Sequence, residues 1–174
     1  MSHSNQSSQE QFDKALNNRL EDLRYNVELG IRYHMLRQSF FQSLHRWITA
    51  LSLTFSTAAV AVLFDGSELG KWFAGLVAGL QALDLVVDTR SQVELHNDIR
   101  RDYLSINKFL SHSSKEYTHI DLDKASDDIK DNELKEPPVK RWLLEYVARD
   151  TDSFLGKDST LKLNWGQVMF RHFW

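Results

Sequence analysis

The sequence predicts an all-α protein built on a long helical hairpin, and three observations support this class. Apolar residues recur every three or four positions over long stretches, which is the period of an amphipathic helix. Two uncharged runs, 47–64 and 72–83, are separated by a short segment rich in turn-forming residues. The only two prolines of the 174-residue chain are adjacent, at Pro137 and Pro138, so no proline interrupts a helix before them.

The first third of the chain predicts one long helix after a polar start. Residues 1–11 are rich in Ser, Gln and Asn, and we expect them to be flexible. From Phe12 onward an apolar stripe with helical spacing begins; its members are Phe12, Leu16, Leu20, Leu23, Val27 and Ile31. Gly30 is the one weak point. The pattern therefore predicts either a single helix from residue 12 to about 64, or two helices with a soft joint near Gly30.

The two apolar runs predict transmembrane helices at about 47–64 and 72–87. The first has 18 residues, and at about 1.5 Å per residue it would extend about 27 Å, close to the thickness of a bilayer's hydrocarbon core. Its polar members carry only hydroxyl groups, which can bond to the backbone of their own helix. The second run is less apolar, because it contains Gln81 and Asp84. The turn at 65–71 is short enough to make the two helices antiparallel.

The helical pattern continues beyond the second run, so we define a hairpin domain at 12–112. Residues 113–136 are highly charged and predict a linker or a solvated helix. The segment 137–174 begins at the two prolines, contains a short amphipathic helix from about 139 to 154, and ends in an apolar tail. We expect this C-terminal helical segment to dock on the other helices or on a neighbouring subunit.

The distribution of positive charge predicts the orientation of the hairpin. Arginines flank both runs on the side away from the turn, whereas the turn carries only Lys71. By the positive-inside rule, both termini are then cytoplasmic. Four basic side chains of these flanks are candidates for a collar that contacts lipid headgroups: Arg37, His45, Arg46 and Arg90. The alternative is a soluble helical domain in which the two runs form the core.

Small residues on the second run predict a helix-packing face. Gly75 and Gly79 form a Gly-xxx-Gly pair, and Ala74, Ala78 and Ala82 repeat at the same spacing. Small side chains at this period allow close approach of another helix in lipid.

Acidic and amide residues on the same helix predict a second face. Gln81, Asp84 and Asp88 follow one another at about one helical turn, so they line one side. Carboxylates within a membrane span commonly face a partner or a water-filled path, and in a ring of subunits this face would favour cations. The alternative is that the membrane ends near Leu83 and that Asp84 lies at its surface.

Several classes of chemistry find no support in the sequence. The chain has no cysteine, which excludes disulfides and thiolate catalysis. Its histidines show no paired spacing for a metal, and it has no phosphate-binding glycine loop or nucleophile elbow. We expect no cofactor, no metal and, at a net charge of −3, no direct binding of nucleic acid. Arg90 and His96 match the Arg-x5-His spacing of HEPN ribonucleases, although Ser91 departs from that pattern.

Three features together resemble the SLATT group of two-transmembrane proteins, over about residues 20–112. They are the stretch RYHMLRQSFF at 32–41, the hairpin itself, and the stretch VVDTRSQVELH at 86–96. The resemblance implies a membrane effector of prokaryotic antiphage defence that oligomerises and permeabilises the bacterial inner membrane. It also implies that a sensor protein or a signalling nucleotide is the trigger, since no sensor domain is fused to the hairpin.

These inferences lead to one hypothesis and two alternatives. The hypothesis is a homo-oligomeric pore in the lipid bilayer, because one hairpin alone cannot enclose a path for water. The first alternative is a non-conducting membrane anchor that recruits a partner through residues 142–174. The second is a helical HEPN-like ribonuclease that uses Arg90 and His96.

Overall fold

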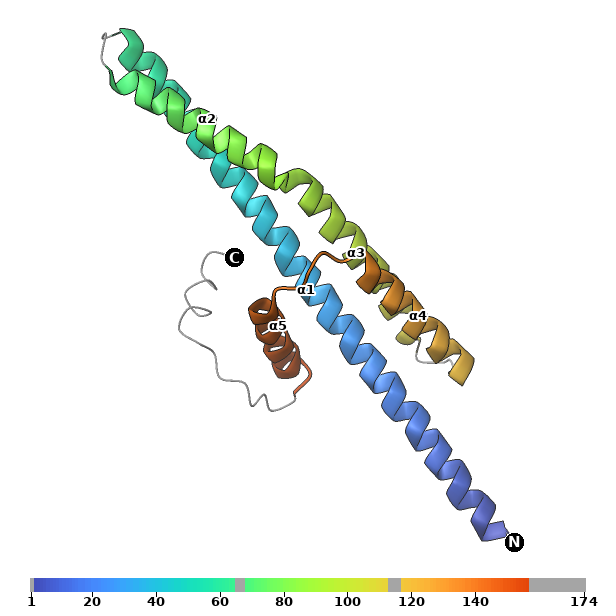
Figure 1. Ribbon diagram of the computed structural model, residues 1–174. Helices are drawn as coiled ribbons and strands as arrows, with labels where there is room; N and C mark the ends of the chain where they lie inside the picture. Colours follow the sequence, from blue (N-terminus) through green and yellow to red (C-terminus); the bar gives the residue numbers. More distant parts are fainter. Residues whose placement is uncertain (1, 65–67, 113–116, 157–174) are drawn as a thin grey trace. The chain divides into compact units, whose positions relative to one another are not determined.

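The computed structural model describes residues 2–64, 68–112 and 117–156, and all of its regular structure there is helical. The helices are α1 (Ser2–Phe64), α2 (Leu69–Val87), α3 (Thr89–Leu110), α4 (His119–Lys135) and α5 (Arg141–Phe154) (Figure 1). The all-α class is confirmed. The apolar tail that we expect to dock, residues 161–174, lies outside the described residues.

The helix bounds differ from the expected ones at three places. α1 begins at Ser2, so helix covers the residues predicted to be flexible, and it continues through Gly30 without a joint. The predicted second helix is interrupted at Asp88, which separates α2 from α3 and has a left-handed backbone with φ 49°. Within the charged segment 113–136, the structure forms α4, whose N-terminus is capped reciprocally by Thr118 and Asp121.

The chain divides into two compact units. The helical unit comprises Met1–Met35 and Asp98–Phe173, and the hairpin unit comprises Leu36–Asn97. The helical unit therefore holds the first part of α1, most of α3, and α4 and α5. The hairpin unit holds the second part of α1, all of α2 and the start of α3.

The helical unit has a core to which each of its helices contributes at helical spacing. The buried hydrophobic side chains are Leu23, Val27, Ile31 and Tyr33 on α1, Ile99, Tyr103, Ile106 and Leu110 on α3, Leu122, Ala125 and Ile129 on α4, and Leu143 and Val147 on α5. Arg24 caps the C-terminus of α3, because its guanidinium donates to the carbonyl of Leu110, the last residue of that helix (2.6 and 3.0 Å). Of the predicted stripe, Leu23, Val27 and Ile31 are buried, whereas Phe12 is exposed.

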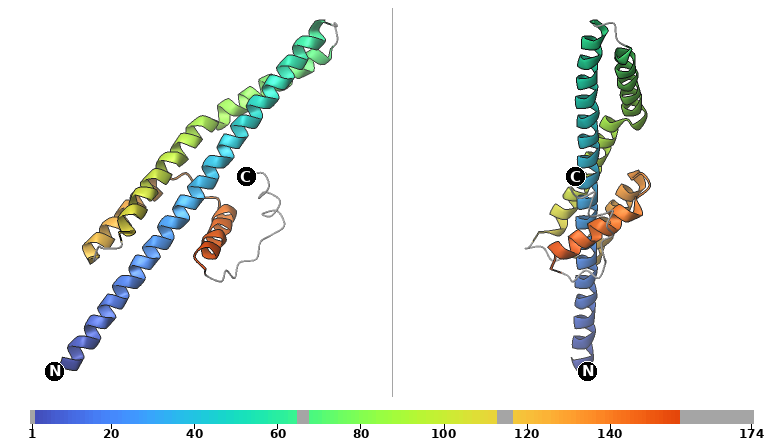
Figure 2. Two further views of the ribbon diagram at one scale, coloured as in Figure 1. Left: turned by 180° about the vertical axis from the view of Figure 1, so that it is seen from behind. Right: turned by 90° about the vertical axis from the view of Figure 1, so that its left-hand side faces the viewer.

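The hairpin unit is a pair of antiparallel helices with little interior. α2 lies beside the second part of α1 in each view (Figure 2). Phe55 and Phe73 stack between the two helices with their ring centroids 5.9 Å apart. The buried residues of α1 here include Ile48, Ser52 and Ala59, whereas Gly70 is the only buried residue of α2.

Candidate functional site

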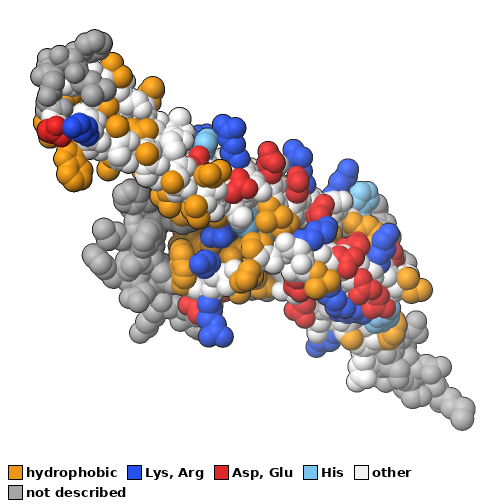
Figure 3. All heavy atoms as spheres, turned by 45° about the horizontal axis from the view of Figure 1, so that its top comes forward, with side chains coloured by type: hydrophobic (Ala, Val, Ile, Leu, Met, Phe, Trp, Pro, Cys, Tyr) orange, Lys and Arg blue, Asp and Glu red, His pale blue; other side chains and the backbone are white. Residues whose placement is uncertain are grey.

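In the hairpin unit, α2 and the end of α1 beside it have a largely apolar outer surface. Large hydrophobic side chains on both helices are exposed, and in Figure 3 hydrophobic side chains gather over the hairpin; among them are Trp47, Leu53 and Val60 on α1 and Trp72, Leu76, Leu83, Leu85 and Val86 on α2. A monomeric soluble domain seldom exposes a contiguous apolar surface of this kind.

By length and composition, one helical stretch of the described residues could cross a membrane, Leu69–Leu110, in which α2 supplies the apolar part. Its most apolar 18-residue window has a mean hydropathy of 1.3, and only 6% of that window is buried. The sequence predicts two such spans, and the described residues contain one. The run 47–64 is the C-terminal end of the 63-residue helix α1 and is not identified as a span among the described residues.

The small residues of α2 face outward. A Cβ added to Gly75 or Gly79 would meet nothing within 4 Å, and Ala74, Ala78 and Ala82 are exposed. The stripe that the sequence predicts as a packing face is therefore not covered by the described residues of this chain. It is open to a second helix.

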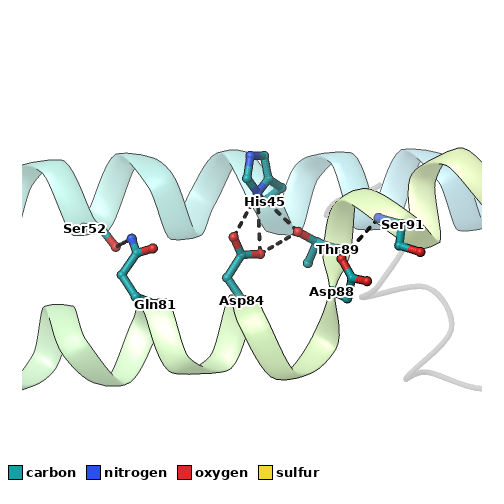
Figure 4. Close-up of polar contacts among 7 residues, drawn as sticks. All are labelled: His45, Ser52, Gln81, Asp84, Asp88, Thr89 and Ser91. Atoms are coloured by element: carbon teal, nitrogen blue, oxygen red, sulfur yellow. Dashed lines mark hydrogen bonds and ion pairs between the residues drawn. The ribbon is translucent and has the colours of Figure 1, made fainter.

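The polar residues of α2 face the opposite way, toward α1. The Gln81 amide donates to the Ser52 hydroxyl at 3.0 Å (Figure 4). The Asp84 carboxylate accepts from the Thr89 hydroxyl at 2.5 Å and lies 3.2 Å from Nδ1 of His45. We call these five side chains the polar seam. Ser52 and His45 come from α1, which explains why spacing along α2 alone did not reveal them.

The side chains of the polar seam form their polar contacts with one another, within the hairpin. Since an ionised carboxylate only accepts hydrogen bonds, the Nδ1 of His45 must carry the proton that lies between Asp84 and Thr89. The Thr89 hydroxyl donates to Asp84 and can accept from His45 at 3.2 Å. Thr89 is buried, and it contributes a partner that the sequence pattern did not single out. The arrangement thus gives the Asp84 carboxylate two partners inside the hairpin.

Asp88 does not share the face of Gln81 and Asp84. Its left-handed backbone ends α2, with its N–H donating to the Asp84 carbonyl at 2.8 Å. Its own carboxylate accepts from the N–H of Ser91 at 3.4 Å, at the start of α3 (Figure 4). Asp88 therefore forms the joint between α2 and α3, and this joint places Thr89 beside Asp84.

The predicted headgroup collar separates into three environments. His45 belongs to the polar seam, and the guanidinium of Arg37 lies over the ring of Phe41, 4.9 Å from its centroid. Arg46 and Arg90 are exposed, as contact with a headgroup requires. Of the four predicted residues, Arg46 and Arg90 are thus exposed to solvent, whereas His45 and Arg37 have contacts within the hairpin unit.

The predicted ribonuclease pair lacks an accessible histidine. His96 is completely buried and stacks on the ring of Phe41, with centroids 5.8 Å apart, whereas Arg90 is exposed. A general acid or base must reach its substrate within hydrogen-bond distance. In the hairpin unit as described, RNA cannot contact His96, which argues against the HEPN alternative.

Among the described residues, no group of three or more His, Asp or Glu side chains is arranged to hold a metal ion. Comparison of the chain with protein-family models, with curated proteins and with solved structures gives no match in any of the three.

Proposed function

We propose that this protein inserts its hairpin unit into a bilayer, assembles with copies of itself and permeabilises the membrane. The observation that carries the proposal is the exposed apolar window of α2, of which only 6% is buried. A core helix of a soluble protein would bury most of such a window. At about 25 cal/mol per Å² of apolar surface, an exposure of this extent in water is costly, and a lipid environment removes that cost.

In the proposal, the run 47–64 of α1 inserts into the bilayer together with α2. The run 47–64 lies beside α2, and its Thr54 and Thr57 hydroxyls donate to carbonyls of their own helix at 2.9 Å. Hydroxyls satisfied in this way are tolerated in lipid. In the proposed topology both segments cross the bacterial inner membrane, and both termini are cytoplasmic because the arginines flank the open end of the hairpin.

The polar seam supports insertion as well. A carboxylate costs about 2.5–3.5 kcal/mol at the centre of a membrane span on insertion scales, unless it finds a partner or water. Asp84 has two partners within the hairpin, and Gln81 has one. The seam therefore lowers the cost of carrying these groups into the bilayer, and it selects α1 as the neighbour of α2.

Oligomerisation follows from the outward-facing small residues. Gly75 and Gly79 leave open space on the side of α2 away from the polar seam, where a helix of another subunit can approach closely. Two helices cannot enclose a path for water, so conduction requires several subunits. The prediction that Gln81, Asp84 and Asp88 line the path remains a prediction, and because Gln81 and Asp84 contact α1, it requires the hairpin to rearrange.

The test combines fractionation of a bacterium expressing the chain with a voltage-sensitive dye. We expect the chain in the membrane fraction and depolarisation of the cells. Gly79→Leu should abolish depolarisation and oligomer formation without loss of membrane residence. Leu53→Phe adds bulk at an exposed position of the other helix, α1, outside the small-residue stripe, and it should retain depolarisation, oligomer formation and membrane residence. Membrane residence without depolarisation, even when the oligomer forms, would favour the non-conducting anchor. A chain recovered only in the cytosol would overturn the proposal.

The role in antiphage defence is the part of the proposal that rests on the resemblance to SLATT proteins. It predicts that overexpression of the chain alone depolarises cells, whereas at native expression depolarisation in a phage-infected culture depends on a partner encoded with this chain. Infection assays with and without Gly79→Leu would test whether protection, if present, requires the assembled hairpin.

A further inference from the structure

We propose that a cavity in the helical unit binds a small organic cation. The cavity has a volume of about 540 Å³ and is formed by α1, α3, α4, α5 and the segment that joins the last two. This volume lies within the range of small-molecule sites in proteins, about 300–1,000 Å³. All of its lining residues belong to the helical unit, so the proposal is independent of whether the hairpin conducts.

The walls of the cavity combine aromatic rings with carboxylates. Tyr33 and Tyr103 contribute phenol rings, and Glu133 and Glu136 contribute acidic groups. Leucine, isoleucine, valine and proline side chains supply the apolar remainder, and no Lys, Arg or His is among the lining residues. Carboxylates attract a cation through charge, and the phenol rings add to the apolar surface that its methylene groups can contact.

The cavity is pre-organised by contacts within the unit. Glu136, whose side chain is only 11% exposed, is held by Nε2 of His34 at 2.7 Å and by the Tyr103 hydroxyl at 3.1 Å. Both contacts end on Oε1 of the carboxylate, so Oε2 can accept from a ligand. The Tyr33 hydroxyl accepts from the backbone N–H of Lys140 at 3.2 Å, which fixes the second ring. A site held in this way loses little conformational entropy on binding.

Glu133 supplies the charge that a ligand would neutralise. It is exposed, lines the cavity, and makes no ion pair with another described residue. The Oε1 of Glu136, in contrast, already contacts His34 and Tyr103. A cation in the cavity would therefore gain most from Glu133, and the Glu136 carboxylate is the second acidic group of the lining.

The same charges argue against other ligand classes. A phosphate group would meet two carboxylates and no lining cation, so a signalling nucleotide is a poor ligand for this cavity. A bare metal ion is also unfavourable, since the described residues hold no cluster of three metal-binding side chains. An organic amine with methylene groups matches both the carboxylates and the apolar wall.

The experiment measures binding of spermidine to the purified full chain in detergent micelles by isothermal titration calorimetry. Spermidine carries ammonium groups separated by methylenes, and adenosine triphosphate and Mg²⁺ serve as the anionic and inorganic comparisons. We expect saturable binding of spermidine that excess Mg²⁺ does not abolish, and no binding of the nucleotide in the cavity.

Two variants show whether the cavity is the site. Glu133→Gln keeps the size of the side chain and disturbs no contact, and it should weaken spermidine binding roughly tenfold, the effect of losing one charge-assisted hydrogen bond. Glu145→Gln removes the same charge from α5 at an exposed position outside the cavity and should leave binding unchanged. Equal effects of both variants, displacement of spermidine by Mg²⁺ at equal charge, or no binding at millimolar concentration would each overturn the proposal.

Discussion

The ring of Tyr103 lies against the backbone of α1 at Gly30, closer than any larger residue at position 30 would allow. A Cβ added to Gly30 would come within 2.8 Å of the ring carbons Cε1 and Cζ. The glycine that the sequence marks as a weak point thus serves the approach of α3 to α1 and does not break the helix. Both residues also line the cavity of the helical unit.

Gly30→Ala should therefore destabilise the helical unit. Alanine is the better helix former by about 1 kcal/mol, but overpacking a buried site costs typically about 1–3 kcal/mol. Tyr103 is buried and bonded to Glu136, so its ring cannot move away freely. We expect a net loss of about 1 kcal/mol in the free energy of unfolding, measured by chemical denaturation and circular dichroism in detergent.

Gly75→Ala is the matched control, because nothing lies within 4 Å of a Cβ at that position. It should leave the stability of the monomer unchanged or raise it. A stabilising Gly30→Ala would contradict the close packing of Tyr103 against α1.

The hydrogen bond between His34 and Glu136 should be the most costly polar contact to remove. His34 is completely buried, and Glu136 is nearly so. Glu136→Ala would leave both the imidazole of His34 and the hydroxyl of Tyr103 without this partner, at a cost of about 3 kcal/mol in the free energy of unfolding. Asp127→Ala removes one member of an exposed ion pair with Lys130 in the same unit and should have no measurable effect. Similar denaturation midpoints for the two variants would contradict this ranking.

Much of the helical architecture follows from local signals, whereas the contacts between helices do not. Apolar spacing and the adjacent prolines predict the helical class and the start of α5 near residue 140. No glycine or proline in the sequence marks the joint at Asp88. Its only local signal is that aspartate tolerates the left-handed region better than most residues. His34 and Glu136 are 102 residues apart, and periodicity gives no information about such a pair. The partners of Asp84 were missed for the same reason.

Alkaline pH should unfold the helical unit in a way that depends on Tyr103. Burial, followed by the nearby Glu136 carboxylate, raises the pKa of Tyr103 well above its ordinary value of about 10. The folded state therefore keeps the proton where the unfolded chain releases it. The stabilisation is complete below pH 10, and it declines as the pH rises above that value.

Ultraviolet absorbance of tyrosinate measures this effect. Of the five tyrosines, Tyr103 should ionise only together with loss of the helical circular dichroism signal. Tyr103→Phe should remove this late component and leave the earlier ionisations in place. Ionisation of all tyrosines while the helical signal is retained would contradict the burial of Tyr103.

At Asp88, the joint between α2 and α3, glycine should be more stable than valine, the reverse of their usual order within a helix. At a left-handed position a β-branched residue is strained, so Asp88→Val should cost about 1–3 kcal/mol, whereas Asp88→Gly should lie within about 1 kcal/mol of the original chain. At Asp98, which lies within α3, valine should instead be tolerated better than glycine. Thermal unfolding of the four variants tests this reversal. If valine is better than glycine at both positions, α2 and α3 form one continuous helix.

Asp84→Asn separates a role in the polar seam from a role in ion selection. Asparagine keeps an oxygen that can accept from the Thr89 hydroxyl, but it removes the charge. If Asp84 keeps its contacts with α1 and Thr89 in the assembled pore, Asp84→Asn should conduct with unchanged cation selectivity in a liposome flux assay. Asp84→Leu removes the acceptor for both Thr89 and His45 and should reduce the yield of folded, membrane-inserted chain. A loss of cation selectivity in Asp84→Asn, with insertion intact, would instead show that the carboxylate faces the conducting path, and the hairpin would then have to open when the subunits assemble.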